Sequence, residues 1–222
     1  MWALPAFCIL NSAFLTAACV SEEPPPDPNI ITIAARVGPN NLHPLKANDE
    51  GTARVGELMY DSLMDTGEDL RAHPTLAESL ERPDPLTYIV HLRRGVKFHD
   101  GHELTARDVV HTFSLFLDPA FVTPFKGAFT VMTGVRAVDD YIVAFSLKAP
   151  FPSFPVTNLV PIPILPAGVD DATLARNPNG TGPYRFVRYA TDDKVEVTAF
   201  PDYWNGQPRN SGLANHRPNS SK

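Results

Sequence analysis

The five residues from His99 to Glu103, with the sequence HDGHE, bring two imidazoles and two carboxylates into one short stretch. Neutral His nitrogen and carboxylate oxygen are ligands for zinc and similar ions, so a metal-dependent hydrolase is one hypothesis for this chain. The spacing favours another interpretation. Helical metal motifs place His at positions i and i+4 on one face, whereas Gly101 predicts a turn with positive φ that points the side chains apart. We therefore expect a structural turn and no metal here.

Other residue patterns give little support to catalysis. Glu78 and Glu81 are too close in sequence to make, by themselves, the separated acid–base geometry that hydrolysis needs. No serine lies in a Gly-x-Ser-x-Gly elbow, and the run Gly180-Thr181-Gly182 has no phosphate-loop lysine. The sequence thus predicts no catalytic residue, no cofactor and no enzyme activity.

The HDGHE cluster is part of a longer stretch, from Tyr88 to Phe113, around which we expect the chain to be organised. Tyr88, Val90 and Leu92 alternate with other residues at period two, which predicts a half-buried strand. Asp100-Gly101 then predicts a sharp turn. A strand should therefore lead directly into the cluster.

A helix is expected directly after the cluster. Thr105 and, three residues later, Asp108 resemble a capping box with an acidic partner. The apolar residues that follow at helical spacing are Val109, Phe113, Phe116 and Leu117. They predict a helix with one buried stripe.

Several other segments have β-rich or helical patterns. The predicted strands are Ile30–Ala35, the hairpin of Phe129–Val138 and Tyr141–Leu147, and the pair Tyr184–Tyr189 and Val195–Phe200. The predicted second helix is Ala53–Met64, with Val55, Leu58, Met59 and Leu63 on its apolar stripe.

Two features near the C-terminal half allow two interpretations each. The proline-broken segment Pro150–Pro166 fits either a short helix or an irregular segment lining a cleft. Tyr203 and Trp204 could stack on a ligand, but an aromatic pair after a strand more often anchors a corner of the fold. The corner is the favoured interpretation.

The composition argues for a folded chain that does not bind nucleic acid. Its 222 residues carry 19 Lys and Arg against 25 Asp and Glu, a net charge of -6, and the basic residues form no patch in the sequence. A hydrophobic content of 43% supports a buried core. The 23 prolines, roughly twice the average share, predict many extended segments and few long helices.

The first thirty residues have the pattern of a targeting segment and a tether. Residues 1–19 are uncharged and mostly apolar, as in a secretory signal peptide, and Leu15–Cys19 (LTAAC) resembles a bacterial lipobox in which Cys19 is lipidated. A plain cleaved signal and an uncleaved anchor are the alternatives. Residues 20–29 include the proline-rich run SEEPPPDPN, which predicts an extended tether.

Five segments, taken in order, resemble the solute-binding protein family 5, the extracytoplasmic peptide- and nickel-type binding components of ABC importers. They are PTLAESLE from Pro74, TYIVHLRRGVKFHDGHELTARDV from Thr87, DDYIVAFSLKAPFPSF from Asp139, GTGPY from Gly180 and PDYWNG from Pro201. The resemblance runs from about Ile30 to Pro208. The loop Asn41-Leu42-His43-Pro44 is similar to the family's Leu-Asp-Pro loop, with His43 where Asp is common.

The resemblance implies a mixed α/β fold, the N-terminal lobe of a two-lobed periplasmic-binding-protein type II-like architecture. Residues 30–56 and 151–208 would form an incomplete ligand-facing lobe, and residues 57–150 an extra α+β subdomain. The second lobe would be missing, because family members are about twice this length or more. Residues 209–222 are expected to form a disordered or non-native tail.

The function implied is that of a solute-binding component that delivers peptides or similar small solutes to an ABC permease, here as a truncated fragment. It would be periplasmic or at the cell surface, with Cys19 lipid-anchored to a bacterial membrane. The residues implied to meet the solute are Asn41, Leu42, His43, Thr181, Gly182 and Tyr184. A metal-dependent hydrolase built on His99–Glu103 and a non-binding surface lipoprotein remain the alternatives.

Overall fold

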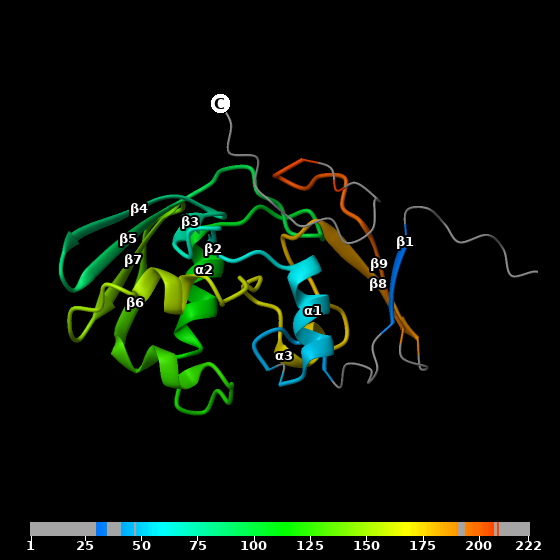
Figure 1. The fold of residues 1–222 in the computed structure, drawn as a ribbon, viewed down its shortest axis with the longest axis horizontal. Helices are drawn as coiled ribbons and strands as arrows, with labels where there is room; N and C mark the ends of the chain where they lie inside the picture. The colour runs from blue at the N-terminus through cyan, green and yellow to red at the C-terminus, as the bar shows by residue number, and fades with distance from the viewer. Residues whose placement is uncertain (1–29, 35–40, 47, 191–193, 207, 209–222) are drawn as a thin grey trace, which may run out of the picture.

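The computed structural model describes residues 30–34, 41–46, 48–190, 194–206 and 208. Two antiparallel sheets lie towards opposite ends of the molecule, with the helix α1 (Glu50–Met59) beside the smaller sheet and α2 (Ala106–Ser114) beside the larger one (Figure 1). A two-stranded hairpin of β2 (Met64–Thr66) and β3 (Ala72–Pro74) follows α1 in the sequence and leads into the larger sheet. The mixed α/β class expected from the sequence is confirmed.

The larger sheet has four strands in the order β4-β5-β7-β6. They are β4 (Ala77–Asp84), β5 (Thr87–Leu92), β6 (Met132–Asp139) and β7 (Ile142–Leu147), all paired antiparallel. In β5 the side chains of Tyr88, Val90 and Leu92 are buried and their neighbours are not, which confirms the predicted alternation. The predicted hairpin of β6 and β7 is also confirmed, although β6 starts after a 3₁₀ helix, η1 (Lys126–Val131).

Helix α2 covers this sheet with aromatic side chains. The ring of Phe113 lies 4.9 Å from that of Phe145 on β7 and 5.8 Å from that of Phe129 in η1, centroid to centroid. Phe116 is buried too, but Leu117 is 40% exposed. The predicted stripe is therefore correct as far as Phe116 and wrong at Leu117, which lies in the turn after α2 ends at Ser114.

The capping box at the start of α2 is confirmed. The Oδ2 atom of Asp108 accepts hydrogen bonds from the backbone N–H of Thr105 at 2.9 Å and from its hydroxyl at 3.1 Å. Its Oδ1 atom accepts another, at 2.8 Å, from the N–H of Ala167 in a segment far away in sequence. Asp108 thus begins the helix and also ties it to the chain that follows the larger sheet.

Removing this carboxylate is expected to destabilise the fold. Replacing Asp108 with alanine should lower the free energy of unfolding by about 2 kcal/mol, because it leaves the N–H groups of Thr105 and Ala167 without their acceptor. Urea unfolding followed by circular dichroism measures this loss. The control is Asp118→Ala, in an exposed turn, where we expect about 0.5 kcal/mol or less. Equal losses in the two variants would contradict the assigned role.

Helix α1 begins and ends earlier than the sequence predicts. It starts at Glu50, where Asp49 caps it by accepting a hydrogen bond from the N–H of Thr52 at 2.8 Å, and it ends at Met59. Leu63, which the helical stripe included, is fully buried but lies beyond the helix, directly before β2. The apolar spacing continued through a change of backbone geometry, so spacing alone placed the helix end too late.

The smaller sheet has the order β1-β9-β8, with strands β1 (Ile30–Ala34), β8 (Tyr184–Ala190) and β9 (Lys194–Ala199). These strands confirm the three predicted ones to within one residue at most ends. Pro150–Pro166, for which the sequence allowed either a short helix or an irregular segment, contains both. A single helical turn, η2 (Pro155–Leu159), is followed by buried extended chain that pairs at Pro163 with Ser62. A short helix, α3 (Asp171–Leu174), precedes β8.

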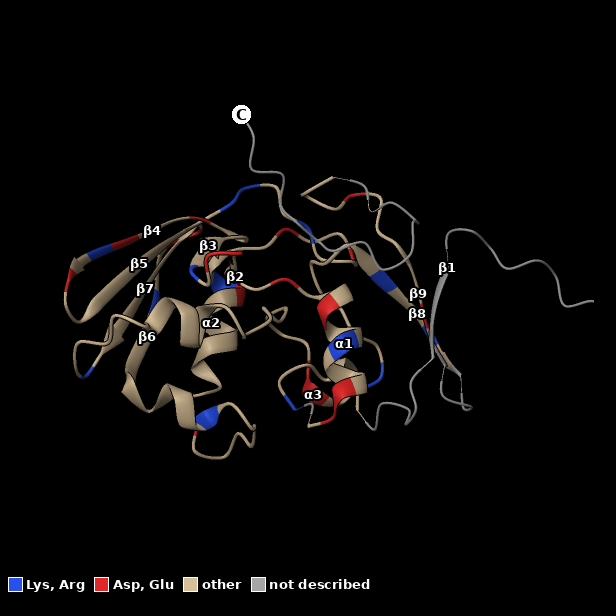
Figure 2. Ribbon diagram, in the orientation of Figure 1, with Lys and Arg blue, Asp and Glu red and all other residues tan. Residues whose placement is uncertain are grey.

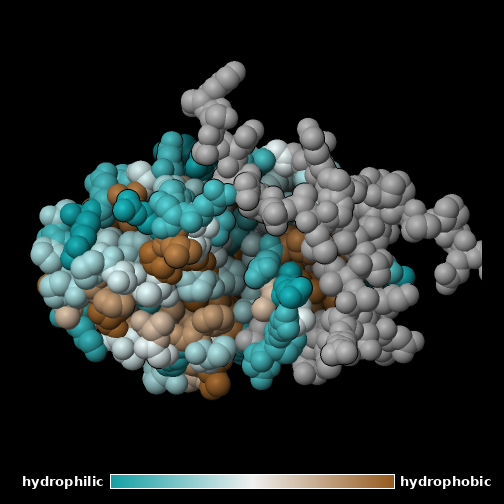
Figure 3. Space-filling view, viewed as in Figure 1, coloured by the Kyte–Doolittle hydropathy of each residue, from teal (hydrophilic) through white to brown (hydrophobic). Residues whose placement is uncertain are grey.

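The surface is mixed in charge, and part of the face shown in Figure 3 is apolar. Lys and Arg are scattered among acidic residues along the described chain (Figure 2). Apolar residues gather on the face over α2 and the segment after it, where Leu117 and Val122 are exposed (Figure 3). No helix within the described residues is long and apolar enough to cross a membrane. Residues 1–29, including Cys19, and residues 209–222 lie outside the described part, so the predictions made for them stay predictions.

Candidate functional site

The glycine loop, which we define as Asn179–Gly182, is the place where the separate sequence motifs meet. It belongs to the GTGPY motif, and it contacts the end of α1 on one side and the HDGHE turn on the other. Its Thr181 side chain is fully buried, and so is the backbone around it. The loop leads directly into β8 at Tyr184.

Contact with α1 requires glycine on this loop. The N–H of Gly182 donates a 3.0 Å hydrogen bond to the carbonyl of Met59, the last residue of the helix. A Cβ atom on Gly182 would lie 2.6 Å from the carbonyl carbon of Met59 and 2.8 Å from the backbone nitrogen of Tyr60. A Cβ on Gly180 would also collide with the Met59 carbonyl oxygen. Both glycines are therefore explained by the close approach of two backbones.

His99 holds the opposite side of the loop. Its backbone N–H donates to the carbonyl of Gly180 at 2.9 Å, its Nδ1 accepts from the N–H of Gly180 at 3.3 Å, and its Nε2 lies 3.0 Å from the carbonyl of Gly182. Asp100 adds a side-chain bond, because its Oδ2 accepts from the amide of Asn179 at 2.7 Å. The HDGHE turn is thus docked on the glycine loop through several hydrogen bonds.

The side chains of the HDGHE turn point apart, as the sequence predicts. His99 faces the glycine loop, while His102 bonds to Asp100, with 2.7 Å between Nδ1 and Oδ1. Glu103 turns elsewhere and accepts from the N–H of Gly95 at 2.7 Å and from the hydroxyl of Tyr141 at 2.8 Å. Gly101 has φ of 95°. Among the described residues no group of three or more His, Cys, Asp or Glu could hold a metal ion, so nothing in the geometry favours the hydrolase alternative.

Asp61, just after α1, is a buried acid that the sequence analysis missed. Its Oδ2 accepts from the indole Nε1–H of Trp204 at 2.8 Å and, in a longer bond of 3.4 Å, from the hydroxyl of Thr181. Its Oδ1 lies 3.4 Å from the hydroxyl of Tyr203. Burial raises the pKa of Asp61 from 3.8 to about 7, against the three hydrogen bonds, which lower it. The signal that could have found it is an acid inside the apolar run from Met59 to Leu63.

Tyr203 and Trp204 therefore form a corner of the fold, as favoured from the sequence. Their rings lie edge to face at 5.7 Å, and the guanidinium of Arg93 lies 5.1 Å from the centre of the Trp204 ring. Burial raises the pKa of Tyr203, and the nearby carboxyl of Asp61 raises it further. The PDYWNG motif thus packs on Asp61, just after the end of α1.

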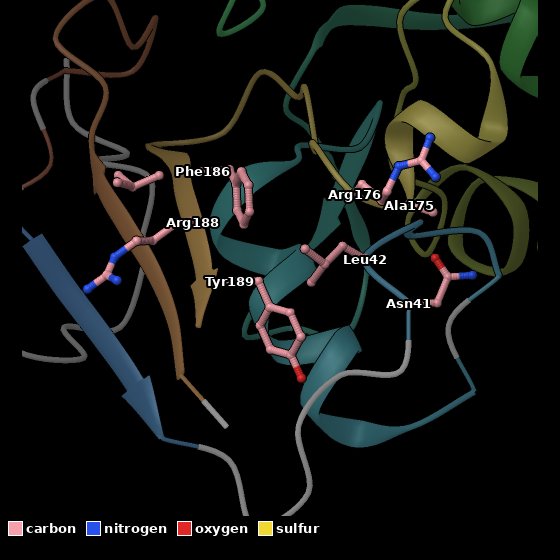
Figure 4. Close-up of a pocket in the computed structure, with 8 residues that line it drawn as sticks. Asn41, Leu42, Ala175, Arg176, Phe186, Arg188 and Tyr189 are labelled. Carbon is pink, nitrogen blue, oxygen red and sulfur yellow. The ribbon is translucent and has the colours of Figure 1, made fainter. Parts of the chain in front are cut away.

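A groove of about 480 Å³ opens between the Asn41 loop, the end of α3 and β8. Its lining residues are Asn41, Leu42, Ala175, Arg176, Phe186, Val187, Arg188 and Tyr189. The rings of Phe186 and Tyr189 point towards Leu42, whereas Arg188 points away (Figure 4). Arg188 instead pairs with Glu196 on β9 through two hydrogen bonds of 2.7 and 2.6 Å. The volume lies within the range of small-molecule sites, and the lining combines aromatic and polar groups.

The Asn41 loop is fixed by a buried histidine. His43 is fully buried, its Nδ1 accepts from the N–H of Leu45 at 3.2 Å, and its Nε2 lies 3.2 Å from Oδ1 of Asp171 at the start of α3. Burial lowers the pKa of His43, and the Asp171 carboxylate opposes this. Since Nδ1 accepts, Nε2 carries the hydrogen and donates to Asp171. His43 therefore links the two segments that form one wall of the groove.

The six residues implied to meet a solute fall into two groups. Asn41 and Leu42 line the groove, and Tyr184, half-buried, begins the strand that forms its other wall. His43, Thr181 and Gly182 are buried and hold the segments next to it. That they bind solute stays a prediction. Arg176, Phe186 and Tyr189, which the sequence analysis did not single out, complete the groove.

Comparison with solved structures gives the class of protein. The fold matches the ABC-transporter substrate-binding protein CtaP from Listeria monocytogenes with a TM-score of 0.70 and 35% identity, over 78% of this chain and 37% of that one. It matches the oligopeptide-binding protein AppA from Bacillus subtilis, solved with a nonapeptide, with a TM-score of 0.72 and 32% identity over the same shares. The fold is thus that of part of a substrate-binding protein of an ABC transporter. More narrowly, the chain belongs to the bacterial extracellular solute-binding proteins, family 5, whose model matches residues 71–214.

Curated relatives agree with this assignment. The chain is 33% identical over 181 residues to the oligopeptide-binding protein AppA of Bacillus subtilis, covering 77% of this chain and 33% of that protein. It is 35% identical over 170 residues to the glutathione-binding protein GsiB of Pectobacterium atrosepticum, covering 74% of this chain and 33% of that protein. The chain therefore spans about a third of the length of these relatives.

Proposed function

We propose that this chain supplies one face of the solute-binding site of an extracytoplasmic component of an ABC importer, and that the solute is a peptide or a similar small molecule. The observation that carries the proposal is the groove between the Asn41 loop, α3 and β8. Membership of the family and the peptide- and glutathione-binding relatives support the class of solute. A transport role, without enzyme activity, follows the relatives' descriptions.

The groove has the chemistry to hold an extended peptide. Phe186 and Tyr189 offer aromatic faces against which apolar side chains or peptide planes can pack. Asn41 offers a side-chain amide, which can both donate to and accept from a peptide backbone. Arg176 is exposed and makes no ion pair within the described residues, so its guanidinium is free to bind a carboxylate.

The proposal extends to the organisation of the chain. Residues 30–56 and 151–208 would form the ligand-facing part, and residues 57–150 the extra subdomain. Cys19 would carry a lipid that holds the protein at the outer side of a bacterial membrane, next to the permease that receives the solute. The mass of the mature protein expressed in a bacterial host tests the lipid directly, because diacylation at Cys19 is lost in a Cys19→Ser variant.

Calorimetric titration with glutathione and with a nonapeptide tests the binding function. Because one face of a site makes only part of the contacts, we expect weak, saturable binding with a dissociation constant of roughly 0.1 to 1 mM. The variants Tyr189→Ala and Arg176→Ala should each weaken binding by about fivefold, which is roughly 1 kcal/mol. Arg136→Ala, at an exposed position of β6 in the larger sheet, is the matched control and should leave the affinity unchanged.

Two results would count against the proposal. Binding that is equally strong in the groove variants and in the wild type would move the site away from the groove. A submicromolar affinity would contradict the claim that this part of the protein supplies only one face of the site.

A further inference from the structure

Both ring nitrogens of His99 contact the backbone of the glycine loop. Nδ1 accepts from the N–H of Gly180 at 3.3 Å, and Nε2 lies 3.0 Å from the carbonyl of Gly182. The residue is 8% exposed, and its ring meets the edge of the Phe200 ring at 5.0 Å. A residue needed only to form the HDGHE turn would require neither of these ring contacts, because Asp100 and Gly101 already make that turn.

These two contacts fix the state of the ring. A carbonyl oxygen can only accept, so Nε2 carries the hydrogen and donates to Gly182, while Nδ1 must be bare to accept from Gly180. A protonated ring could keep the first bond but not the second. The charged groups facing the ring are Asp100, which favours protonation, and Arg185 on β8, which opposes it. Burial is the largest influence, and it lowers the pKa of His99 to about 4.

The position of the glycine loop sets the position of the groove. The loop is held against Met59 on its other side, where neither Gly180 nor Gly182 has space for a Cβ atom. After the loop, the carbonyl of Pro183 accepts from the N–H of Phe200 at 2.8 Å, and Tyr184 then begins β8. Two and five residues further along β8 are Phe186 and Tyr189, the aromatic wall of the groove.

We propose that His99 is a positioning residue for the solute site: its neutral ring clamps the glycine loop and thereby fixes the register at which β8 presents Phe186 and Tyr189. The effect on solute rests on the proposed function, whereas the clamping of the loop does not. The two steps can therefore be tested separately.

Three substitutions separate the two ring contacts. The amide of His99→Asn can replace the acceptor at Nδ1, and the longer side chain of His99→Gln can replace the donor at Nε2, while His99→Phe keeps the ring volume and loses both bonds. We expect hydrogen exchange of the Gly180 amide to be about tenfold faster in the Phe and Gln variants and near the wild-type rate in the Asn variant. The carbonyl ¹³C shift of Gly182 should move in the Phe and Asn variants and stay in the Gln variant.

His102→Asn is the control, because the ring of His102 stacks on Phe98 and bonds to Asp100 without touching the loop. It should leave both Gly180 exchange and the Gly182 shift unchanged. If His99→Phe does not fold, the wild-type protein still tests the clamp by its pH profile. Between pH 5.5 and 3.5, exchange of Gly180, corrected for the intrinsic pH effect, should accelerate in the wild type and stay flat in His99→Asn.

The effect of the clamp on solute binding is tested with the nonapeptide as probe. If the clamp positions the groove, His99→Phe should weaken nonapeptide binding at least fivefold while His102→Asn does not. The inference would be overturned if the Gly180 amide exchanged at the wild-type rate in all three His99 variants. It would also be overturned if the corrected exchange rate in the wild-type protein did not change between pH 5.5 and 3.5. If Gly180 exchange is faster in the His99 variants but the wild-type protein binds no peptide, the clamp is upheld and the proposed function is refuted.

Discussion

Replacing Gly182 with alanine is expected to lower the free energy of unfolding by about 3 kcal/mol or more, among the largest losses for any single methyl group added to this chain. The added Cβ would lie 2.6 Å from the carbonyl carbon of Met59 and 2.8 Å from the backbone nitrogen of Tyr60. Both neighbours are backbone atoms at the end of α1, which cannot move aside as a flexible side chain can. Relief requires the glycine loop to shift, and that shift would break its bonds to His99 and Met59.

The measurement is equilibrium urea unfolding of Gly182→Ala beside Gly134→Ala. Gly134 lies in β6, and a methyl group added to it would have no neighbour within 4 Å, so its alanine variant should be neutral or slightly stabilised, by about 0.5 kcal/mol. A Gly182 variant as stable as the Gly134 variant would show that the two backbones do not approach as closely as the structure has them.

The second large effect is the response of stability to pH through Asp61. Burial raises its pKa from 3.8 to about 7, so the folded protein binds this proton more tightly than the unfolded chain does. The stabilisation that comes from this tighter proton binding at Asp61 is fully present below pH 3.8, and it is lost as the pH rises through 7. At 1.36 kcal/mol for each pH unit of difference, the loss from this one group is about 4 kcal/mol.

The variant Asp61→Asn should remove this loss. Its side-chain oxygen, in the place of Oδ2, can still accept from the Nε1–H of Trp204 and from the hydroxyl of Thr181, and its amide nitrogen, in the place of Oδ1, can donate to the hydroxyl oxygen of Tyr203. We therefore expect the variant to match the wild type near pH 4 and to be more stable by a few kcal/mol at pH 8, measured as the difference between two urea titrations at each pH.

Asp65→Asn provides the control for this profile, because Asp65 lies exposed on β2 only four residues further along the chain. Its difference from the wild type should change by about 0.5 kcal/mol or less over the same pH range. A wild-type stability that rises from pH 4 to pH 8 relative to Asp61→Asn would give the opposite sign and contradict the assignment of a raised pKa to Asp61.

Local patterns predicted the larger sheet and its helix well. The alternation of Tyr88, Val90 and Leu92 required one buried face, and the pairing of Thr105 with Asp108 required a helix start, so neither depended on distant residues. The same holds for the HDGHE turn, where the sequence Asp100-Gly101 predicted the sharp turn that the φ of Gly101 confirms. Helix ends were less secure, because the apolar spacing from Val55 to Leu63 continued after α1 had ended at Met59.

The groove and the buried acid could not be predicted in the same way. Asp61 meets Thr181 and Trp204, which are 120 and 143 residues away in sequence, and no local pattern records such a meeting. The resemblance pointed to the Asn41 loop and to Tyr184, but the aromatic wall at Phe186 and Tyr189 depends on which side of β8 faces Leu42. That choice follows from packing, including the irregular pairing with β9 between Phe186 and Arg188.

These long-range contacts show that the HDGHE turn has a structural role. Its concentration of ionisable side chains suggests chemistry, yet each of them is bonded within the fold: His99 to the glycine loop, Asp100 to Asn179, and Glu103 to Tyr141. The turn thereby joins residues 57–150 to the segment that forms the groove. A motif typical of the family thus also holds the segment that leads into the candidate site.

The central claim, that the groove of Asn41, α3 and β8 meets the solute, is tested most directly by photo-crosslinking. A nonapeptide carrying a benzophenone side chain would be irradiated with the protein, and the crosslinked residues identified by mass spectrometry of the digested complex. We predict crosslinks at residues 41–42, 175–176 and 186–189 that unlabelled nonapeptide suppresses. Crosslinks confined to the larger sheet or to the HDGHE turn, or crosslinks that unlabelled peptide does not suppress, would contradict the claim.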